Sequence, residues 1–408
     1  MKNACGSALS ALRDINRKKV LDAIRANPVI SRTALTGKVR LSRATVSGIV
    51  AELIEAGLVE EIGEGDSTGG RPPITLQFRP EGKMAVGVVL LNNDIQAALT
   101  DMEGNLLSSL DIPVPNSTPD SMLQCMQQAV ENVLTGVNRK RVLGVGVGTP
   151  GIVNLQTGII ALSTSKRWLN GDIHVKDILE AQLGLPVHVT NRSRVAALGE
   201  FKVGVGRGLS NLVYLFLGQG IVAGIVMDGQ LFFGSSFGSG EIGHISIYPD
   251  GPLCACGNHG CLEVYATEEA LLARAREAAR DSQDNRLQFA VGGSLERLTL
   301  DHMLQAAHEG DSLVLSILRD AGIDVGMAVA TLINLFNPEM VVIGGPLGCS
   351  AGHFFLQSVI EEAKRRTLPR LFVKARIVSG MSCTYAEAIG AAVLAVSQSP
   401  VDAFFASG

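Results

Sequence analysis

The chain has 408 residues, of which 46% are apolar and 18% are charged, and this composition excludes a largely disordered protein. Such a length exceeds what one hydrophobic core usually serves, so we expect two or three domains. We find no N-terminal stretch typical of a signal peptide and no run of eighteen apolar residues, so we expect no membrane insertion. Seven cysteines, an odd number, fit a cytoplasmic protein better than a disulfide framework.

The net charge of −4 is unevenly distributed along the chain. Residues 1–80 contain twelve Lys and Arg against eight Asp and Glu, so the rest of the chain is acidic. A basic N-terminal part on an acidic body is typical of a protein whose N-terminal part meets an anionic polymer. An ordinary solvated surface explains the charge alone equally well.

Residues 16–63 predict three helices and the start of a β-hairpin. Ser31 and Ser42 are placed to cap the second and third helices, and Gly57 is placed to end the third. The third helix carries an apolar stripe that we expect to face the interior, formed by Val46, Ile49, Val50 and Leu53. Three polar residues lie off this stripe near the start of the helix, namely Arg43, Thr45 and Ser47.

A short helix, a tight turn and a second helix that begins with small polar and Arg residues form the helix-turn-helix pattern. The start of such a helix fits the major groove, so we expect it to contact operator DNA through Ser42, Arg43, Thr45 and Ser47. The strand–turn–strand that follows reads as a wing, with Arg71 at its tip between glycine and proline, suited to an A·T-rich minor groove. Residues 1–80 are therefore predicted to be a winged helix-turn-helix DNA-binding domain; a dimerisation module is the alternative.

The body of the chain contains an internal repeat. Residues 85–107 align without gaps onto residues 210–232, and both read as strand, turn, strand, turn, strand. A repeated unit predicts two similar α/β lobes with a cleft between them, over 81–200 and 201–408, unless the similarity of two hairpins is chance. Helices are expected at 119–137, 173–183, 192–202 and 311–336.

One short segment concentrates metal-binding side chains. His244, Cys254, Cys256 and Cys261 supply one imidazole and three thiols, a set typical of a closed tetrahedral Zn²⁺ site. His259 is a rival fourth ligand, although its place inside the loop would crowd the ion. A disulfide between Cys254 and Cys256 would need a strained ring, and a catalytic thiol needs one cysteine rather than three.

Around these cysteines the sequence resembles the ROK family (repressors, open reading frames, kinases). The resemblance is carried by "GEIGHISI" and "CACGNHGCLE" within 240–263, "VGVGTPGIV" at 145–153, "LINLFNPEMVVIGGPL" at 332–347 and "AEAIGAAVLA" at 386–395. With the winged helix in front, it covers nearly the whole chain and is most similar to the repressor branch, which includes regulators of glucose, N-acetylglucosamine and xylose genes.

The resemblance implies a two-lobed fold of the actin and hexokinase type, a duplicated ribonuclease H-like architecture, in which the zinc loop braces a sugar pocket. It implies sugar contacts from Asn191, Glu241, His244 and Glu263, and their chemistry agrees, because carboxylates and amides match vicinal hydroxyls. His244 would bind zinc through one ring nitrogen and a hydroxyl through the other. A helix cap remains an equal reading of Asn191, and a solvated or zinc-supporting carboxylate is the alternative for each glutamate.

Two departures from the family's kinases are visible. The turn that holds the ATP phosphates in those kinases is Val89–Asn93 here and lacks the acid and both glycines. The kinases' general base, an Asp that follows Asn, is replaced by Arg192, whose guanidinium stays protonated and cannot remove a hydroxyl proton. Both departures predict a degenerate sugar kinase without catalytic residues, and Arg192 is then free to pair with acids or to contact the ligand.

The sequence therefore predicts a sugar-responsive transcriptional repressor that assembles as a homodimer or homotetramer on operator DNA and responds to a small-molecule sugar effector. The alternative is an active ROK-type sugar kinase with an accessory DNA-binding domain. A third hypothesis replaces the sugar effector with a protein, such as a component of sugar transport.

Overall fold

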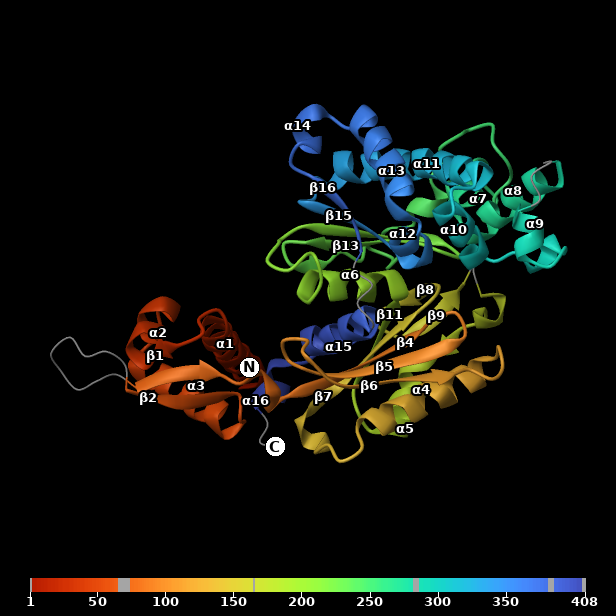
Figure 1. The fold of residues 1–408 in the computed structure, drawn as a ribbon. Helices are drawn as coiled ribbons and strands as arrows, with labels where there is room; N and C mark the ends of the chain where they lie inside the picture. Colours follow the sequence, from red (N-terminus) through yellow and green to blue (C-terminus); the bar gives the residue numbers. More distant parts are fainter. Residues whose placement is uncertain (1, 65–73, 164–165, 282–285, 381–384, 406–408) are drawn as a thin grey trace.

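The computed structural model describes residues 2–64, 74–163, 166–281, 286–380 and 385–405. The chain forms an N-terminal winged-helix domain and two α/β lobes, and the winged-helix domain lies beside the first lobe (Figure 1). Among the described residues, none of the helices combines the length and the apolar character needed to cross a membrane.

The winged-helix domain contains the three predicted helices and the hairpin. Its elements are α1 (Lys2–Arg25), β1 (Ile30–Ser31), α2 (Arg32–Val39), α3 (Arg43–Glu55), β2 (Val59–Glu64) and β3 (Ile74–Phe78), with the antiparallel sheet order β1-β3-β2. Both predicted caps are present, because the side chains of Ser31 and Ser42 accept hydrogen bonds from the backbone N–H groups of Ala34 and Thr45. Gly57, at φ +73°, lets the chain turn directly after α3. The predicted stripe of α3 is buried.

The first lobe is built on a five-stranded mixed sheet in the order β11-β7-β4-β5-β6. β11, β7 and β4 are parallel, β5 is antiparallel to β4, and β6 is antiparallel to β5. The strands are β4 (Met84–Leu90), β5 (Asp94–Asp101), β6 (Leu106–Pro113), β7 (Val142–Thr149) and β11 (Val187–Asn191). The fully buried, Val-rich runs of β4 and β7 are typical of central strands that are covered on both faces.

Two helices pack on one face of this sheet, α4 (Pro119–Val133) and α5 (Val175–Leu183). Thr118 caps α4 and Pro119 occupies its first turn, where the missing N–H of proline costs nothing. α4 ends four residues before the predicted end at 137. A small antiparallel sheet joins β7 to α5 and consists of β8 (Ile152–Asn154), β9 (Ile159–Leu162) and β10 (Ile173–His174).

The second lobe repeats the sheet of the first. Its order is β14-β13-β12-β15-β16, again with three antiparallel strands followed by two parallel ones. The strands are β12 (Leu212–Leu217), β13 (Ile221–Met227), β14 (Gln230–Leu231), β15 (Met340–Gly344) and β16 (Arg376–Ser379). Since β12 to β14 correspond to β4 to β6 in order and direction, the predicted internal repeat and the duplicated fold class are confirmed.

The helices of the second lobe cover the outer face of its sheet (Figure 1). They are α7 (Glu263–Ala266), α8 (Glu268–Asp281), α9 (Arg286–Ala290), α10 (Leu300–His308), α11 (Ser312–Phe336), α12 (Gly345–Ser350), α13 (Gly352–Arg366) and α14 (Pro369–Phe372). The central helix α11 is capped at its start by Asp311, whose carboxylate accepts from two backbone N–H groups, and at its end by Asn337 in a left-handed conformation.

Two helices lie between the sheets of the two lobes, α6 (Arg192–Lys202) and α15 (Ala386–Gln398). α6 packs on the second-lobe sheet, whereas α15 packs on the first-lobe sheet, although α15 follows the second-lobe strands in the chain. Close contact requires glycine here: a Cβ at Gly87 would lie 1.7 Å from the carbonyl O of Ala388, and a Cβ at Gly390 would lie 1.8 Å from that of Val195. The two lobes therefore exchange helices instead of dividing at one point in the sequence.

The winged-helix domain and the first lobe share one hydrophobic core. A single buried cluster combines Val20 and Leu58 of the domain with Ala85, Met102, Leu143 and Ala392 of the lobe and its helix α15. The short helix α16 (Val401–Phe405) follows α15 and returns to the winged-helix domain, where the guanidinium of Arg17 lies 4.6 Å from the ring centroid of Phe405. The winged-helix domain is thus held to the lobe rather than tethered by a free linker.

Candidate functional site

The start of α3 presents polar side chains to solvent. Ser42, Arg43, Thr45 and Ser47, the four predicted DNA contacts of this helix, are all exposed. The hydroxyl oxygens of Ser42 and Thr45 lie 2.8 Å apart, so the N-terminal turn is held by the cap. This geometry leaves a polar helix end free to approach a groove.

Glu52, further along α3, fastens the helix to α1. It accepts hydrogen bonds from Arg13 at 2.7 Å and from Arg17 at 2.8 Å. Burial raises the pKa of Glu52, but these two arginines outweigh burial and leave the pKa below 4.5.

β2 and β3 pair as the predicted wing hairpin. Arg71, which was predicted for the wing tip, lies outside the described residues. At the base of the hairpin, Arg32 of α2 forms an ion pair with Glu61 of β2 at 2.5 Å, which ties the wing to the helix-turn-helix.

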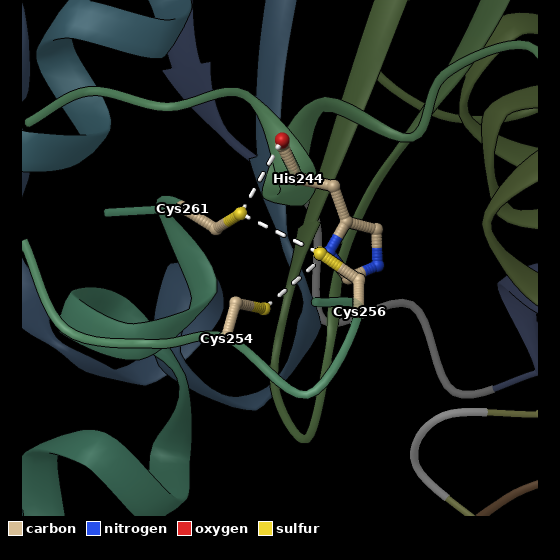
Figure 2. A group of neighbouring side chains, drawn as sticks. All are labelled: His244, Cys254, Cys256 and Cys261. Carbon is tan, nitrogen blue, oxygen red and sulfur yellow. Dashed lines mark hydrogen bonds between the residues drawn. The ribbon is translucent and has the colours of Figure 1, made fainter. Parts of the chain in front are cut away.

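The four predicted metal ligands come together in the second lobe (Figure 2). One ligand atom from each of His244, Cys254, Cys256 and Cys261 lies within 4.8 Å of every other. The sulfurs of Cys256 and Cys261 are 3.7 Å apart, and the sulfur of Cys254 is 3.8 Å from Nδ1 of His244. In a tetrahedral site with metal–sulfur bonds of about 2.3 Å, neighbouring sulfurs lie about 3.8 Å apart. The cluster therefore resembles a tetrahedral zinc site in both donor set and spacing.

His259, the rival ligand, is exposed and lies outside this cluster. Its Nδ1 is 3.0 Å from the carbonyl O of Gly251, within the loop. The loop approaches itself closely, because a Cβ at Gly260 would lie 1.6 Å from the carbonyl O of Tyr248. Glycine at this position lets the chain return to Cys261.

His244 links the metal cluster to Glu263. Nδ1 of the imidazole faces the thiols, and Nε2 lies 3.9 Å from Oε2 of Glu263. Oε1 of Glu263 accepts from the backbone N–H of Ile221 at 2.8 Å. Gly243 makes this arrangement possible, since a Cβ there would lie 2.4 Å from the carbonyl O of Ile221 and 2.7 Å from Cγ of Glu263.

A cavity of about 610 Å³ lies between the lobes and adjoins the metal cluster. Its lining from the first lobe and α6 includes Asn92, Gly151, Ser163, Lys166, Asn170, Asn191 and Arg192; its lining from the second lobe includes Phe216, Gln219, Glu241, His244, Cys256 and Glu263. All four predicted sugar-binding residues therefore line one cavity.

Asn191 and Glu241 differ in how far their hydrogen-bonding groups are already occupied by other groups of the protein. Asn191 caps α6: its Oδ1 accepts from the backbone N–H and the hydroxyl of Ser193, and its Nδ2 donates to the carbonyl O of Gly151 at 2.8 Å. Burial raises the pKa of Glu241 above 4.5, although the nearby charges of His244 and Arg194 oppose the shift. A buried carboxylate at the cavity wall gains most from a ligand that donates hydrogen bonds.

Arg192, at the first position of α6, pairs with an acid 195 residues away. Its Nε donates to Glu387 at 2.5 Å and its Nη2 at 3.1 Å, in a bidentate pair whose side chains are only 15% and 16% exposed. Its guanidinium also lies 4.9 Å from the ring centroid of Phe216. Burial opposes the charge, but Glu387 outweighs it and raises the pKa of Arg192.

The turn after β4 forms the first-lobe wall of the cavity. The backbone N–H of Leu91 donates to the carbonyl O of Asp94, which closes the turn, and Asn92 lines the cavity. The ammonium of Lys166 donates to the carbonyl O of Asn92 at 2.6 Å. Sequence analysis identified neither Lys166 nor Glu387, because a single lysine in a loop and a single glutamate at a helix start carry no local signal.

Two family models match the chain. Residues 85–398 match the ROK family, and residues 13–60 match winged helix-turn-helix DNA-binding domains. Among similar proteins, a xylose repressor of Caldicellulosiruptor bescii is 32% identical over 372 residues, which cover 90% of this chain and 91% of the repressor. The DNA-binding transcriptional dual regulator NagC of Escherichia coli is 29% identical and covers 82% of this chain, with 81% of its own length.

Solved structures agree with the fold. A ROK family transcriptional regulator, a homolog of the Escherichia coli MLC protein, has a TM-score of 0.81 at 28% identity and covers 97% of this chain and 98% of its own. A ROK family glucokinase from Streptomyces griseus, in complex with glucose and AMPPNP, has a TM-score of 0.65 at 28% identity, covering 76% of this chain and 98% of the kinase. The chain belongs to the ROK family and is a transcriptional regulator in which a winged helix-turn-helix precedes a body of the hexokinase fold.

Proposed function

We propose that this ROK protein is a sugar-responsive repressor that binds operator DNA through α3 and the wing, and binds a sugar between its lobes. One observation carries the proposal: a single chain joins an exposed polar helix start to a cavity lined by two carboxylates, an amide and an imidazole. The names of the similar xylose and N-acetylglucosamine repressors support it.

On the DNA side, Ser42, Arg43, Thr45 and Ser47 meet base edges and phosphates in the major groove. Arg71 of the wing enters the minor groove. One chain carries one α3, so a homodimer or homotetramer is needed to contact two half-sites about one helical turn apart.

On the sugar side, Glu241 and Glu263 accept from neighbouring hydroxyls, and the imidazole of His244 and the second N–H of Asn191 contact others. Glu263 is held in place by the backbone N–H of Ile221, which leaves Oε2 for a ligand or for His244. The pairing of carboxylates with vicinal hydroxyls is the reason that we assign a carbohydrate rather than an apolar ligand.

Zinc is the ion that we assign to His244, Cys254, Cys256 and Cys261, because three thiols and one imidazole form a closed structural set. When bound, the ion supplies structural cross-linking and fixes the tautomer of His244. His244 then presents Nε2 to the cavity, where it lies near Glu263.

The proposed function does not include phosphoryl transfer. The position of the general base in related kinases holds Arg192, whose guanidinium stays protonated and is paired with Glu387. The segment Val89–Asn93, which matches the phosphate-binding turn of those kinases, contains no carboxylate that could organise Mg²⁺ with a nucleotide. We therefore assign the cavity to sensing.

α6 is the element that transmits the effect of a bound sugar from the cavity to the DNA-binding domain. Its first residue, Arg192, lines the cavity, and its last, Lys202, donates to Glu103 at 3.0 Å. Glu103 also accepts from Arg25 of α1 at 2.6 Å. A sugar that favours one lobe arrangement moves α6 and thereby biases the position of α1.

The test uses duplexes that the purified full-length protein selects from a random library. Operator affinity is measured by fluorescence anisotropy with D-xylose, D-glucose or N-acetyl-D-glucosamine, and sugar binding by calorimetry. We expect at least one sugar or sugar derivative to change operator affinity by about 5- to 150-fold. If the protein selects no DNA, the DNA-binding assignment is wrong; if DNA binds but no carbohydrate has an effect, the effector is a protein.

A coupled ADP assay with Mg²⁺, ATP and the same sugars tests the kinase alternative. We expect no turnover above background. Turnover that disappears in Glu241→Ala would establish an active kinase and overturn this part of the proposal.

A further inference from the structure

Lys166 is a buried cation at the wall of the cavity. Its residue surface is 9% exposed, and its ammonium donates to the carbonyl O of Asn92 at 2.6 Å. Its backbone is held on both sides: its N–H donates to the hydroxyl of Ser163, and its carbonyl accepts from the N–H of Leu169. The lysine is therefore positioned by its loop rather than left to sample solvent.

The charge of Lys166 has no ionic partner in the described part of the chain, where no carboxylate lies within 4.0 Å of its ammonium. An ammonium has three donors, and one neutral carbonyl uses only one of them. A cation that is removed from water without an anion is costly, so such a group is usually paired or meets a ligand.

The charged group that acts on Lys166 is another cation, Arg192. Burial, together with the positive charge of Arg192, lowers the pKa of Lys166 below 10.5. Glu387 balances Arg192, so among the described residues that line this end of the cavity Lys166 contributes one positive charge in excess. Glu241 and Glu263 line the second-lobe wall of the same cavity.

We infer that the cavity takes an anionic sugar, whose charged group is contacted by Lys166 while its hydroxyls meet Glu241 and Glu263. This inference rests on the proposed sugar binding and adds the class of ligand. An anionic oxygen satisfies the remaining ammonium donors through charge-assisted hydrogen bonds and neutralises the excess charge. A neutral sugar can accept a hydrogen bond from Lys166 but leaves that charge uncompensated. The anion is a phosphate ester or a carboxylate, and both have the required oxygens.

The test compares neutral and anionic sugars on the full-length protein by isothermal titration calorimetry. The probes are D-glucose, D-glucose 6-phosphate and D-glucuronate, then N-acetyl-D-glucosamine and its 6-phosphate, with inorganic phosphate alone. We expect an anionic sugar to bind about 10- to 100-fold more tightly than its neutral counterpart. Preference for the phosphates or for glucuronate distinguishes the two sources of the charge.

The variant Lys166→Met removes the charge and keeps most of the side-chain length. We expect it to lose the preference for the anionic sugar, while the affinity for the neutral sugar, which loses at most one hydrogen bond, falls by about 10-fold or less. Lys176→Met is the matched control, because Lys176 also donates to a single backbone carbonyl, that of Gln156, but lies outside the cavity. The control Lys176→Met should keep the preference for the anionic sugar. If Lys166→Met does not fold, the comparison of anionic and neutral sugars on the wild-type protein still tests the inference.

Equal affinity for neutral and anionic sugars in the wild type overturns this inference and leaves sugar sensing intact. An equal loss for both in Lys166→Met also overturns it, and shows that Lys166 only braces the turn at Asn92. Binding of inorganic phosphate alone, with no preference among the sugars, means an adventitious ion only. No heat with any of these probes overturns the inference, and sugar sensing is rejected as well only if D-xylose also gives no heat.

Discussion

Glu103, in the turn between β5 and β6, accepts two hydrogen bonds from the guanidinium of Arg25, from Nη2 at 2.6 Å and from Nε at 3.0 Å. This contact joins the first lobe to α1 of the DNA-binding domain. The other oxygen of Glu103 accepts from Lys202 at the end of α6, so one carboxylate connects the DNA-binding domain with a helix that starts in the cavity. Asp101 holds the turn, because its Oδ1 accepts from the N–H groups of Glu103 and Asn105.

Glu103→Ala should uncouple sugar from DNA. It removes the shared acceptor of Arg25 and Lys202 without touching the cavity or α3. We expect operator affinity without sugar to change little and the sugar-induced change to shrink by about 2- to 30-fold. The measurement is the ratio of operator Kd values with and without the effective sugar. Glu131→Ala, which removes an exposed pair with Arg139, is the control; an equal ratio in both variants would refute the role of Glu103.

Arg43→Ala should weaken operator binding without changing sugar affinity, because Arg43 is exposed at the start of α3 and does not line the cavity. We expect a loss of about 1–3 kcal/mol, or roughly 5- to 150-fold in Kd. Arg71→Ala should also weaken binding, mainly at A·T-rich flanking positions. Anisotropy titrations check both, with the exposed Arg280→Ala of the body as control. Operator affinity equal to wild type in Arg71→Ala would mean that the wing assignment is wrong.

Glu387→Gln should destabilise the protein markedly. The substitution leaves the buried guanidinium of Arg192 without its counter-ion and beside Lys166. Removing one partner of such a pair costs about 3 kcal/mol. Glu131→Gln breaks a pair whose side chains are 43% and 44% exposed and should cost less than about 1 kcal/mol. Urea unfolding followed by circular dichroism compares them; similar midpoints would show that the Arg192 pair is no more important than a surface pair.

Cys256→Ser should lower zinc content, thermal stability and sugar affinity together. The variant removes one of four ligands, and the loop then no longer holds His244 and Glu263 through the ion. Metal analysis should find about one zinc per wild-type chain and well under half in the variant. Cys349→Ser, which alters a thiol outside the cluster, should keep its zinc. Wild-type protein that contains no zinc after gentle purification would contradict the assignment.

The hydrogen bonds and ion pairs by which Arg13 and Arg17 of α1 bind Glu52 of α3 should weaken in acid. The pKa of Glu52 is lowered in the folded protein, so the unfolded chain takes up a proton first as the pH falls. The stability that Glu52 adds is therefore complete above pH 4.5 and is lost as the pH falls through the lowered folded-state pKa. Calorimetric melting temperatures of wild type and Glu52→Gln between pH 3 and 7 should converge at the acid end. A difference that is constant across this range would show that Glu52 acts without its charge.

The elements that were predicted well have local signals. Ser31 and Ser42 cap helices that begin at the next residue, and the stripe of α3 repeats within four turns. The three cysteines lie within eight residues, so their shared purpose is visible in the sequence. The two lobes could also be predicted from the sequence, because two copies of one strand–turn–strand unit indicate a duplicated fold.

Other features depend on residues that are distant in the chain. Arg192 was expected to pair with acids or to contact the ligand, and nothing in the sequence indicates Glu387, 195 positions away, as its partner. The exchange of α6 and α15 between the lobes follows from packing at Gly87 and Gly390, where backbones meet.

The sequence by itself determined the DNA-binding domain, the duplicated body and the metal-ligand set, because caps, periodicity and ligand spacing act over a few residues. Only the tertiary structure decided that Lys166 meets the cavity with no acid among its described neighbours, that Glu387 pairs with Arg192, and that Glu103 joins α1 to α6. Charge balance in a buried site is a sum over neighbours in space, and spatial neighbours from distant segments are set by the fold.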